Sequence, residues 1–349
     1  MDTPSVLIGM SGGVDSSTAA MLLQDQGYRC GGATMLLWDQ TDCRDARAIC
    51  DQLAIPHTVL DFRDLFRGCV ISHFVESYEQ GRTPNPCIYC NKTMKFGRML
   101  EAARDLGYSH VATGHYAQIR FDPATGRYQM LKADDRAKDQ TYFLYSLTQD
   151  QLAHTLFPLG HLTKEEIRKI AEGRGLLTAR KHDSQDICFI PDGDYVSFLK
   201  RYTHKQYPEG SYLDMEGKVI GTHKGAVSYT LGQRRGLGIA LGEPAYVCGK
   251  DMEKNTVTLG PNEALMHRAL TARDFNWILP LDREEAIPCT AKIRHTQYDQ
   301  PCTAYPLPEG RCRIVFDKPQ RAITAGQAAV LYQGDLVIGG GTIEGFLPD

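Results

Sequence analysis

The sequence predicts an α/β protein that begins with a doubly wound parallel sheet and continues into two small β-rich domains, the last a β-barrel. Three observations lead to this fold class. Apolar runs alternate with helical stretches over residues 1–120, and a glycine-rich turn joins the first run to the first helix. After about residue 205, short β-rich runs separated by Gly, Pro and Asn replace that alternation.

The elements of the first domain follow from the alternation. Strands are expected at residues 6–10, 32–37, 57–61 and 110–115, and helices at 18–26, 44–53, 67–80 and 96–106. In sheets of this kind, ligands bind beyond the carboxyl ends of the strands. Residues 139–204 are predicted to be largely helical, with a helix cap at Thr163. The expected domain limits are 1–204, 205–270 and 271–349.

Composition excludes several classes of protein. No apolar run is long enough to cross a bilayer, and residues 1–4 lack the pattern of a signal peptide. The eleven cysteines are odd in number and irregularly spaced, which fits free thiols in a reducing compartment better than a disulfide framework. We therefore expect a cytoplasmic protein. With a net charge of −3, any nucleic-acid partner must bind a local basic patch.

The glycine-rich turn at Ser11–Ser17 is the most informative segment. A strand, a turn and a helix in this order present backbone N–H groups to a phosphate. Gly12 and Gly13 permit close approach, and Ser16 adds a hydroxyl. Asp15 is useful beside phosphates mainly if it holds Mg²⁺ or orients a donor. No Gly-Lys-Ser/Thr follows, which excludes a Walker A loop, and a turn that binds nothing is the alternative interpretation.

A second motif combines rigid prolines with a pair of cysteines. The run Thr83-Pro84-Asn85-Pro86-Cys87-Ile88-Tyr89-Cys90 precedes basic residues, of which Lys95 is one, at the start of a predicted helix. Cysteines in such places usually have pKa values below about 8.5, so one or both are expected to be thiolates at neutral pH. A third cysteine, Cys188, follows Ser184–Asp186. Inert thiols, a zinc site without an obvious fourth ligand, and redox, sulfur-transfer or iron–sulfur chemistry are the interpretations left open.

Taken together, these motifs resemble a known family. The S-G-G-x-D-S turn looks like the PP-loop of the ATP pyrophosphatase superfamily, which cleaves ATP between its α and β phosphates. With the P-N-P-x-x-x-C-N-K and D-x-C-F-I segments, the chain is similar to the bacterial tRNA-specific 2-thiouridylase family. Further blocks at 138–144, 225–238 and 339–343 match that family in order, so the resemblance covers essentially the whole chain.

The resemblance implies ATP-dependent 2-thiolation of the wobble uridine, U34, of tRNA. Adenylation makes the C2 oxygen a leaving group, and persulfide sulfur replaces it to give 2-thiouridine. The implied cofactors are ATP and Mg²⁺, with Asp15 as the candidate Mg²⁺ ligand. The residues implied for nucleotide binding are Gly9, Met10, Ser11, Gly12, Gly13, Val14, Asp15, Ser16, Met35 and Gly114.

The resemblance also implies roles for the cysteines. Cys188 would carry the persulfide, and Cys90 would act as the partner nucleophile. Cys87 departs from the family, because many relatives have Asp there. Cys87 is therefore a third thiol, or one of three ligands, with Cys90 and Cys188, of a 4Fe–4S cluster. The resting state of the three cysteines (thiols, a disulfide or a cluster) is left open.

The implied partners are tRNAs with Lys, Glu and Gln anticodons and a sulfur donor, either a cysteine desulfurase or a relay protein. From the residues alone, His115 fits a core histidine equally well, and basic pairs such as Arg180-Lys181 are more often solvated. Ala325 stands where relatives usually have Pro, but Gln327 is still expected to face RNA. The implied tRNA contacts are Asn85, Pro86, Cys87, His115, Lys138, Asp139, Gln140, Arg294, His295 and Gln327.

Two other functions are considered. One is a different PP-loop adenylating ligase or amidotransferase, although no glutaminase module is evident. The other is a non-catalytic tRNA-binding protein with a decayed loop, which the intact turn and the three cysteines oppose.

Overall fold

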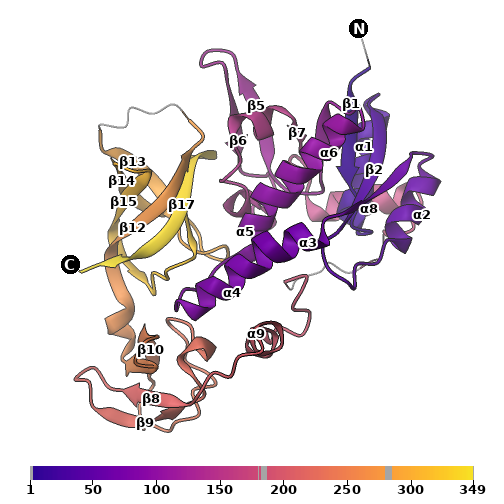
Figure 1. Ribbon diagram of the computed structural model, residues 1–349. Coiled ribbons are helices and arrows are strands. Elements are labelled where there is room, and N and C mark those ends of the chain that lie inside the picture. Colours follow the sequence, from indigo (N-terminus) through magenta and orange to yellow (C-terminus); the bar gives the residue numbers. More distant parts are fainter. Residues whose placement is uncertain (1–2, 180, 182–186, 280–284, 349) are drawn as a thin grey trace.

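The protein was examined as a computed structural model that describes residues 3–179, 181, 187–279 and 285–348. Its N-terminal part is built on a parallel five-stranded sheet in the order β3-β2-β1-β4-β7 (Figure 1). The strands are β1 (Ser5–Gly9), β2 (Arg29–Leu36), β3 (His57–Asp61), β4 (His110–Ala112) and β7 (Thr155–Leu156). The predicted parallel sheet and its first four strands are confirmed. Strands with continuous buried apolar runs, such as β1, suit a sheet that helices cover on both faces.

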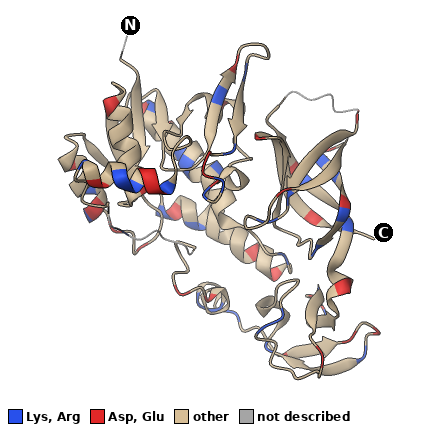
Figure 2. Ribbon diagram, turned by 180° about the vertical axis from the view of Figure 1, so that it is seen from behind, with Lys and Arg blue, Asp and Glu red and all other residues tan. Residues whose placement is uncertain are grey.

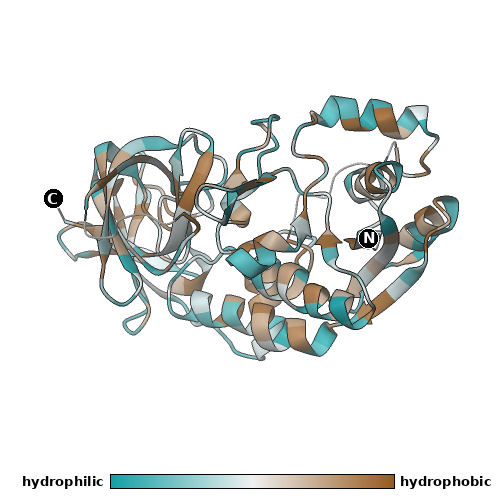
Figure 3. Cartoon of the chain, turned by 90° about the horizontal axis from the view of Figure 1, so that it is seen from above, coloured by the Kyte–Doolittle hydropathy of each residue, from teal (hydrophilic) through white to brown (hydrophobic). Residues whose placement is uncertain are grey.

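Helices cover the sheet and then extend away from it. The predicted helices are present, but the third begins earlier and includes a π-helical turn, and the fourth opens with another. The helical segments are α1 (Val14–Asp25), α2 (Arg44–Gln52), α3 (Arg63–Phe66), η1 (Arg67–Ile71), α4 (Ser72–Glu79), α5 (Pro86–Cys90), η2 (Asn91–Arg98) and α6 (Met99–Asp105). Seen from above, hydrophilic and hydrophobic residues alternate along the helices (Figure 3).

Residues 139–204 differ from their prediction. Helices there are short and separated by turns, because Pro158, Gly160, Pro191 and Gly193 interrupt the chain. The predicted cap at Thr163 is confirmed: its hydroxyl accepts from the Glu166 N–H at 3.3 Å, and a Glu166 carboxylate oxygen accepts from the Thr163 N–H at 2.7 Å. The helices are η3 (Thr141–Phe143), α7 (Gln149–Ala153), α8 (Lys164–Gly173) and α9 (Tyr195–Thr203).

The two β-rich parts are also confirmed. The middle part is a four-stranded sheet in the order β10-β11-β8-β9, packed on Tyr212 and Val257. The C-terminal part is a closed barrel, because β12 pairs with both β15 and β17. The elements are β8 (Gly210–Leu213), β9 (Val219–His223), η4 (Ala226–Ser228), β10 (Tyr246–Asp251), β11 (Thr256–Gly260), η5 (Asn262–Leu265), β12 (Met266–Trp277), β13 (Ile287–Lys292), β14 (Gln300–Leu307), β15 (Arg311–Arg321), β16 (Ala328–Gln333) and β17 (Leu336–Leu347). The domain limits stay a prediction.

A hairpin of the N-terminal part joins the barrel. Strands β5 (Gln118–Asp122) and β6 (Arg127–Leu131) extend the barrel sheet, with Met130 opposite Val337. This hairpin was not predicted, although the Asp-Pro-Ala-Thr-Gly turn between its strands is a signal for one.

The sheet and the barrel share one hydrophobic core. Residues of the parallel sheet, such as Leu7, pack in the same cluster as Val330 and Tyr332 of β16. Tyr142 is fully buried between them, and its hydroxyl donates to the Ala328 carbonyl at 3.2 Å. Consequently the two parts are held as a single body.

Acidic and basic residues are interspersed over all three parts and are not separated by sign (Figure 2). Within the described ranges, none of the helices has both the length and the apolar character needed to span a membrane.

The shared core predicts a stability effect. Tyr142→Ala should lower the free energy of unfolding by about 3–5 kcal/mol, because it removes a fully buried ring from the junction. Tyr142→Phe should cost about 1–3 kcal/mol, because the buried N–H and carbonyl of Ala328 both lose the Tyr142 hydroxyl as their partner. Urea unfolding measures both, with Tyr298→Ala as the control, since Tyr298 is 85% exposed. Equal effects at positions 142 and 298 would contradict the shared core.

Candidate functional site

The glycine-rich turn has the geometry of a phosphate-binding loop. It leaves the carboxyl end of β1 and enters α1, whose N-cap is Gly13. Gly12 has a φ of +70°, and a Cβ there would lie 2.8 Å from the Cβ of Asp45. Only glycine fits this backbone without strain. The turn thus brings the unpaired N–H groups at the start of α1 to the edge of the sheet, as anion binding requires.

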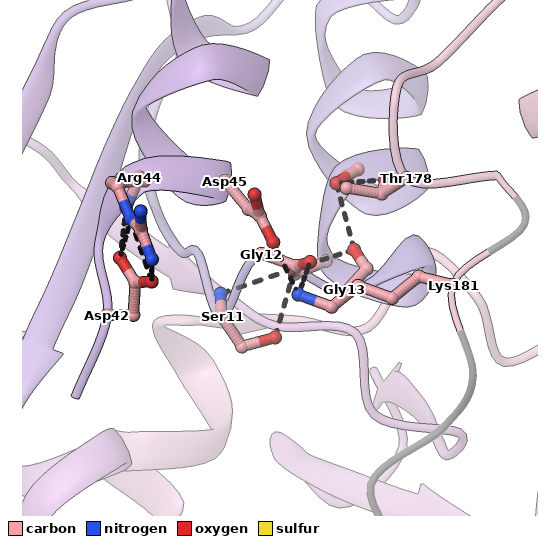
Figure 4. Close-up of polar contacts among 10 residues, drawn as sticks. Ser11, Gly12, Gly13, Asp42, Arg44, Asp45, Thr178 and Lys181 are labelled. Atoms are coloured by element: carbon pink, nitrogen blue, oxygen red, sulfur yellow. Dashed lines mark hydrogen bonds and ion pairs between the residues drawn. The ribbon is translucent and has the colours of Figure 1, made fainter. Parts of the chain in front are cut away.

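Serine hydroxyls stabilise the turn from within. The Ser16 hydroxyl accepts from the Ser11 N–H at 3.3 Å and donates to the Gly13 carbonyl at 3.2 Å. Ser17 also donates to that carbonyl, at 2.8 Å, and its hydroxyl accepts from Thr178 at 3.0 Å (Figure 4). Ser17 is therefore a structural residue, whereas Ser11 is exposed where a ligand would lie.

The other residues predicted to bind the nucleotide gather around the turn. A Cβ on Gly114, after β4, would lie 2.8 Å from the Ser16 nitrogen, so this glycine lets β4 end against the turn. Thr34 of β2 donates to the Met10 carbonyl at 2.9 Å, and its neighbour Met35 is half-buried at the same edge. The ends of β1, β2 and β4 thus meet as expected for a nucleotide site.

Asp15 is already engaged. Its two carboxylate oxygens lie 2.7 and 2.8 Å from the Lys164 ammonium, and the Tyr116 hydroxyl donates to it at 2.7 Å. The prediction of Asp15 as a Mg²⁺ ligand does not fit this arrangement, because an ammonium occupies the place of the cation. Asp15 instead joins α1 to the start of α8.

The proline-rich motif forms the short helix α5. Pro86 is its first residue, and the N-cap Asn85 accepts from the Cys87 N–H at 3.2 Å. Cys87 is exposed at the first turn, whereas Cys90 is buried at the end of the helix. Beyond Cys90 the chain continues as π-helix, a form that often marks functional sites.

The structure brings the three candidate cysteines together. Cys188 is exposed, while the next residues, Phe189 and Ile190, are buried in the hydrophobic cluster that contains Cys90. Cys87 and Cys188 both raise the pKa of Cys90 through their charges, and the charge of Lys95 acts to lower the pKa values of all three thiols. The motif residues at 184–186 lie outside the described part of the chain.

Burial acts against the predicted thiolate forms of the three cysteines. Burial raises the pKa of Cys90 to about 12, and burial also raises the pKa values of Cys87 and Cys188. Lys95 acts in the opposite direction but is outweighed. The sequence-based prediction weighs the cation and the helix end and leaves out desolvation, which favours the neutral thiol.

Among the residues that the structure describes, no group of three or more His, Cys, Asp or Glu side chains is placed to hold a metal ion. The 4Fe–4S cluster on Cys87, Cys90 and Cys188 stays a prediction.

Several residues predicted to contact RNA also make contacts within the protein. The Gln327 amide donates to the Thr83 carbonyl at 2.8 Å, and the Thr83 N–H donates to the Ala325 carbonyl at 2.9 Å. Gln327 thus fixes the segment that leads into α5, and the turn forms although Ala325 replaces the usual Pro. A Cβ on Gly326 would lie 3.0 Å from the Thr83 nitrogen, so the contact between barrel and motif is close.

Three more of these residues are turned inward. His115 is buried against two phenylalanine rings and hydrogen-bonds to Thr113 at 2.7 Å, and burial holds its pKa well below the usual value. Asp139 is buried and accepts from the Thr141 hydroxyl at 2.7 Å. The Gln140 side chain accepts from the Tyr116 N–H at 2.9 Å. Direct RNA contacts by His115 and Asp139 do not agree with their burial.

The remaining candidates are more open. His295 is exposed and lies 4.4 Å, between ring centroids, from Phe143, whose carbonyl accepts from Asn91 beside Cys90. Lys138 is half-buried, and Arg294 donates to the Arg321 carbonyl at 2.7 Å. Of the predicted contacts, His295 and Cys87 are thus the exposed ones near the thiols.

Sequence reasoning missed Lys164, Tyr116 and the importance of Lys181. Lys164 is the first residue of α8, where the helix dipole disfavours a cation, and this mismatch is a signal that it pairs with an acid. Lys181 was noted only as half of a basic pair whose other member, Arg180, lies outside the described residues.

Comparisons with known proteins agree with this arrangement. Three family models match consecutive parts of the chain: the tRNA methyl transferase HUP domain at residues 4–192, the tRNA methyl transferase PRC-barrel domain at 196–261 and the aminomethyltransferase beta-barrel domain at 267–343. These names refer to methyl transfer, whereas the full-length relatives are named for thiolation.

The full-length relatives are similar along their whole length. The tRNA-specific 2-thiouridylase MnmA of Acetivibrio thermocellus is 46% identical over 99% of this chain and 100% of its own length. Proteins of the same name from Moorella thermoacetica and Clostridioides difficile are 49% and 46% identical, over 97% of this chain and 99% and 98% of their own lengths. This chain belongs to the tRNA-specific 2-thiouridylase family.

Proposed function

We propose that this protein uses ATP to convert the wobble uridine of tRNA to 2-thiouridine. The observation that carries the proposal is that the N-terminal part holds both a phosphate-binding turn and three thiols, with Cys87 and Cys188 close enough to Cys90 to affect its ionisation. A turn alone supports nucleotide binding. The thiols add sulfur chemistry, which an adenylating ligase or a methyl-transfer enzyme would leave unused.

In the proposed reaction, ATP enters with its own Mg²⁺ and lies along the ends of β1, β2 and β4. The N–H groups of the turn hold the phosphates, and Asp15 stays paired with Lys164. The C2 oxygen of the uridine attacks the α-phosphate, pyrophosphate leaves, and the oxygen becomes part of an AMP ester. This ester is a good leaving group, whereas the original carbonyl oxygen is not.

Sulfur is then transferred from Cys188 to the uridine, and the two cysteines supply the two electrons that this transfer requires. The terminal sulfur of a persulfide on Cys188 attacks C2, and AMP departs with the original oxygen. Cys90, after losing its proton, attacks the Cys188 sulfur and releases the new thiocarbonyl sulfur. The products are 2-thiouridine and a Cys90–Cys188 disulfide, which a dithiol reductant returns to thiols. Cys87 is adjacent and forms the alternative partner for Cys188.

The same geometry suggests the partners. Cys188 is exposed and thus accessible to a donor protein that carries a persulfide, either a cysteine desulfurase or a relay protein. The half-buried Asn85 and the exposed Cys87 lie at the start of α5, beside the buried Pro86, and the exposed His295 offers a ring on which a base can stack. We expect the enzyme to act in the cytoplasm on tRNAs with Lys, Glu and Gln anticodons.

The first prediction concerns the nucleotide products. Pyrophosphate and AMP should appear only when tRNA is present, because the uridine oxygen is the group that receives the adenylate. A coupled pyrophosphate assay with and without tRNA measures this. Formation of ADP, or equal turnover without tRNA, would rule out uridine adenylation.

The second prediction separates the thiols from the loop. Cys90→Ser and Cys188→Ser should each lower thiolation at least about a hundredfold, because a serine oxygen cannot exchange sulfur. Pyrophosphate release should persist in both. Quantifying 2-thiouridine in tRNA nucleosides is the measurement, and Cys248→Ser in the middle domain is the matched control. Full activity of either site variant would refute its role.

The third prediction concerns pH. Burial raises the pKa of Cys90 to about 12, so below that value its thiolate fraction grows about tenfold for each unit of rising pH. The single-turnover rate of sulfur release should therefore increase between about pH 7 and 9. A rate that is constant or falls over this range would show that Cys90 ionisation does not limit the step.

A further inference from the structure

Lys181 contacts the phosphate-binding turn from a distant part of the chain. Its ammonium donates to the Gly12 carbonyl at 3.0 Å and to the Asp45 carboxylate at 2.6 Å (Figure 4). Gly12 is the residue whose positive φ shapes the turn, and Asp45 belongs to the first turn of α2. The ammonium thus lies beside the turn that is proposed to bind the ATP phosphates.

The ammonium has capacity for a further ligand. It carries three protons, and the described residues supply two acceptors. The side chain is 47% exposed, and its partner Asp45 is 58% exposed. An ion pair this exposed contributes little to stability and separates readily. A phosphate oxygen can therefore reach Lys181 without rearrangement of the core.

Acidic side chains near the turn would repel a polyphosphate, and Lys181 can offset that repulsion. A Cβ on Gly12 would lie 2.8 Å from the Cβ of Asp45, so this acidic residue lies directly beside the turn. Asp42 adds a second acidic side chain near the turn. Its hydrogen bonds with Arg44 lower its pKa to about 2, and the charge of Lys181 contributes a smaller lowering. Arg44 is bound to Asp42 through hydrogen bonds of 2.6–3.1 Å, so its charge offsets mainly Asp42 and only in smaller part Asp45. A polyphosphate entering the turn meets Asp45, and Lys181 is the cation positioned between them.

We propose that Lys181 is a ligand of the ATP polyphosphate, whose ammonium moves from Asp45 to the phosphate oxygens and stabilises the departing pyrophosphate. The inference rests on the proposed use of ATP. A free AMP molecule lacks the β- and γ-phosphates, so it should depend far less on Lys181. In the ATP-free state Asp45 holds the ammonium beside the turn and thereby prepares it for binding.

The test compares the affinities of ATP and AMP by calorimetric titration of the full-length protein. Lys181→Met should weaken ATP binding at least about tenfold and AMP binding less than about threefold, because charged hydrogen bonds to phosphate are strong. Lys181→Arg should retain most of the affinity. Lys169→Met is the matched control, since Lys169 pairs with Glu165 at 2.7 Å on the exposed surface of α8. Equal weakening of ATP and AMP would overturn the polyphosphate assignment.

A double variant separates phosphate binding from simple neutralisation of Asp45. Asp45→Asn alone should tighten ATP binding, because it removes both a repulsive charge and a competitor for Lys181. If the ammonium binds phosphate, Lys181→Met with Asp45→Asn should remain at least about fivefold weaker than Asp45→Asn alone. Restoration to the Asp45→Asn affinity would show that Lys181 only neutralises Asp45 and would overturn the proposal.

Two controls keep the outcomes distinct. Thermal unfolding checks each variant, and Lys181→Gln, which can still donate to the Gly12 carbonyl, replaces the Met variant if that does not fold. If the wild-type protein binds no ATP, the proposed function fails. If the wild type and all Lys181 variants bind ATP equally, only the role of Lys181 fails.

Discussion

The buried contact of Tyr142 with Ala328 is the interaction on which the geometry of the site depends. It fixes the barrel to the parallel sheet through one core, so that the turn around Gln327 meets Thr83 at a constant position. Thr83 begins the proline-braced segment that aims α5. The barrel therefore acts on the chemistry at a distance: it positions the backbone that carries Cys87 and Cys90, in addition to any contact it makes with RNA.

Burial explains the state of the thiols. Cys90 lies among aromatic and aliphatic side chains, which favour the neutral form and leave it a poor nucleophile. Such a thiol is protected from unwanted oxidation while no substrate is bound. Its deprotonation has to accompany a change in its surroundings, and the arrival of tRNA and the sulfur on Cys188 provides one. Reactivity is thus tied to the assembled complex.

The elements best predicted from the sequence were those that local pattern decides. The apolar run of β1, the positive φ at Gly12 and the cap at Thr163 all depend on neighbouring residues. The contacts that the sequence does not reveal involve partners distant in sequence. Asp15 pairs with Lys164 on α8, and Gln327 donates to the Thr83 carbonyl, but nothing in either segment indicates these partners. The proximity of the three cysteines was implied by the family, whereas their protonation depends on packing that no motif reveals.

The hairpin β5–β6 has a consequence for the order in which the protein is made. Strand β6 of this hairpin pairs with Leu336 and Val337, at the start of β17. During synthesis, the hairpin emerges well before β17, so the edge of β6 stays unpaired until β17 has left the ribosome. The N-terminal part therefore completes its folding only when β17 is available. Nascent chains that stop short of β17 should expose this edge to chaperones and proteases.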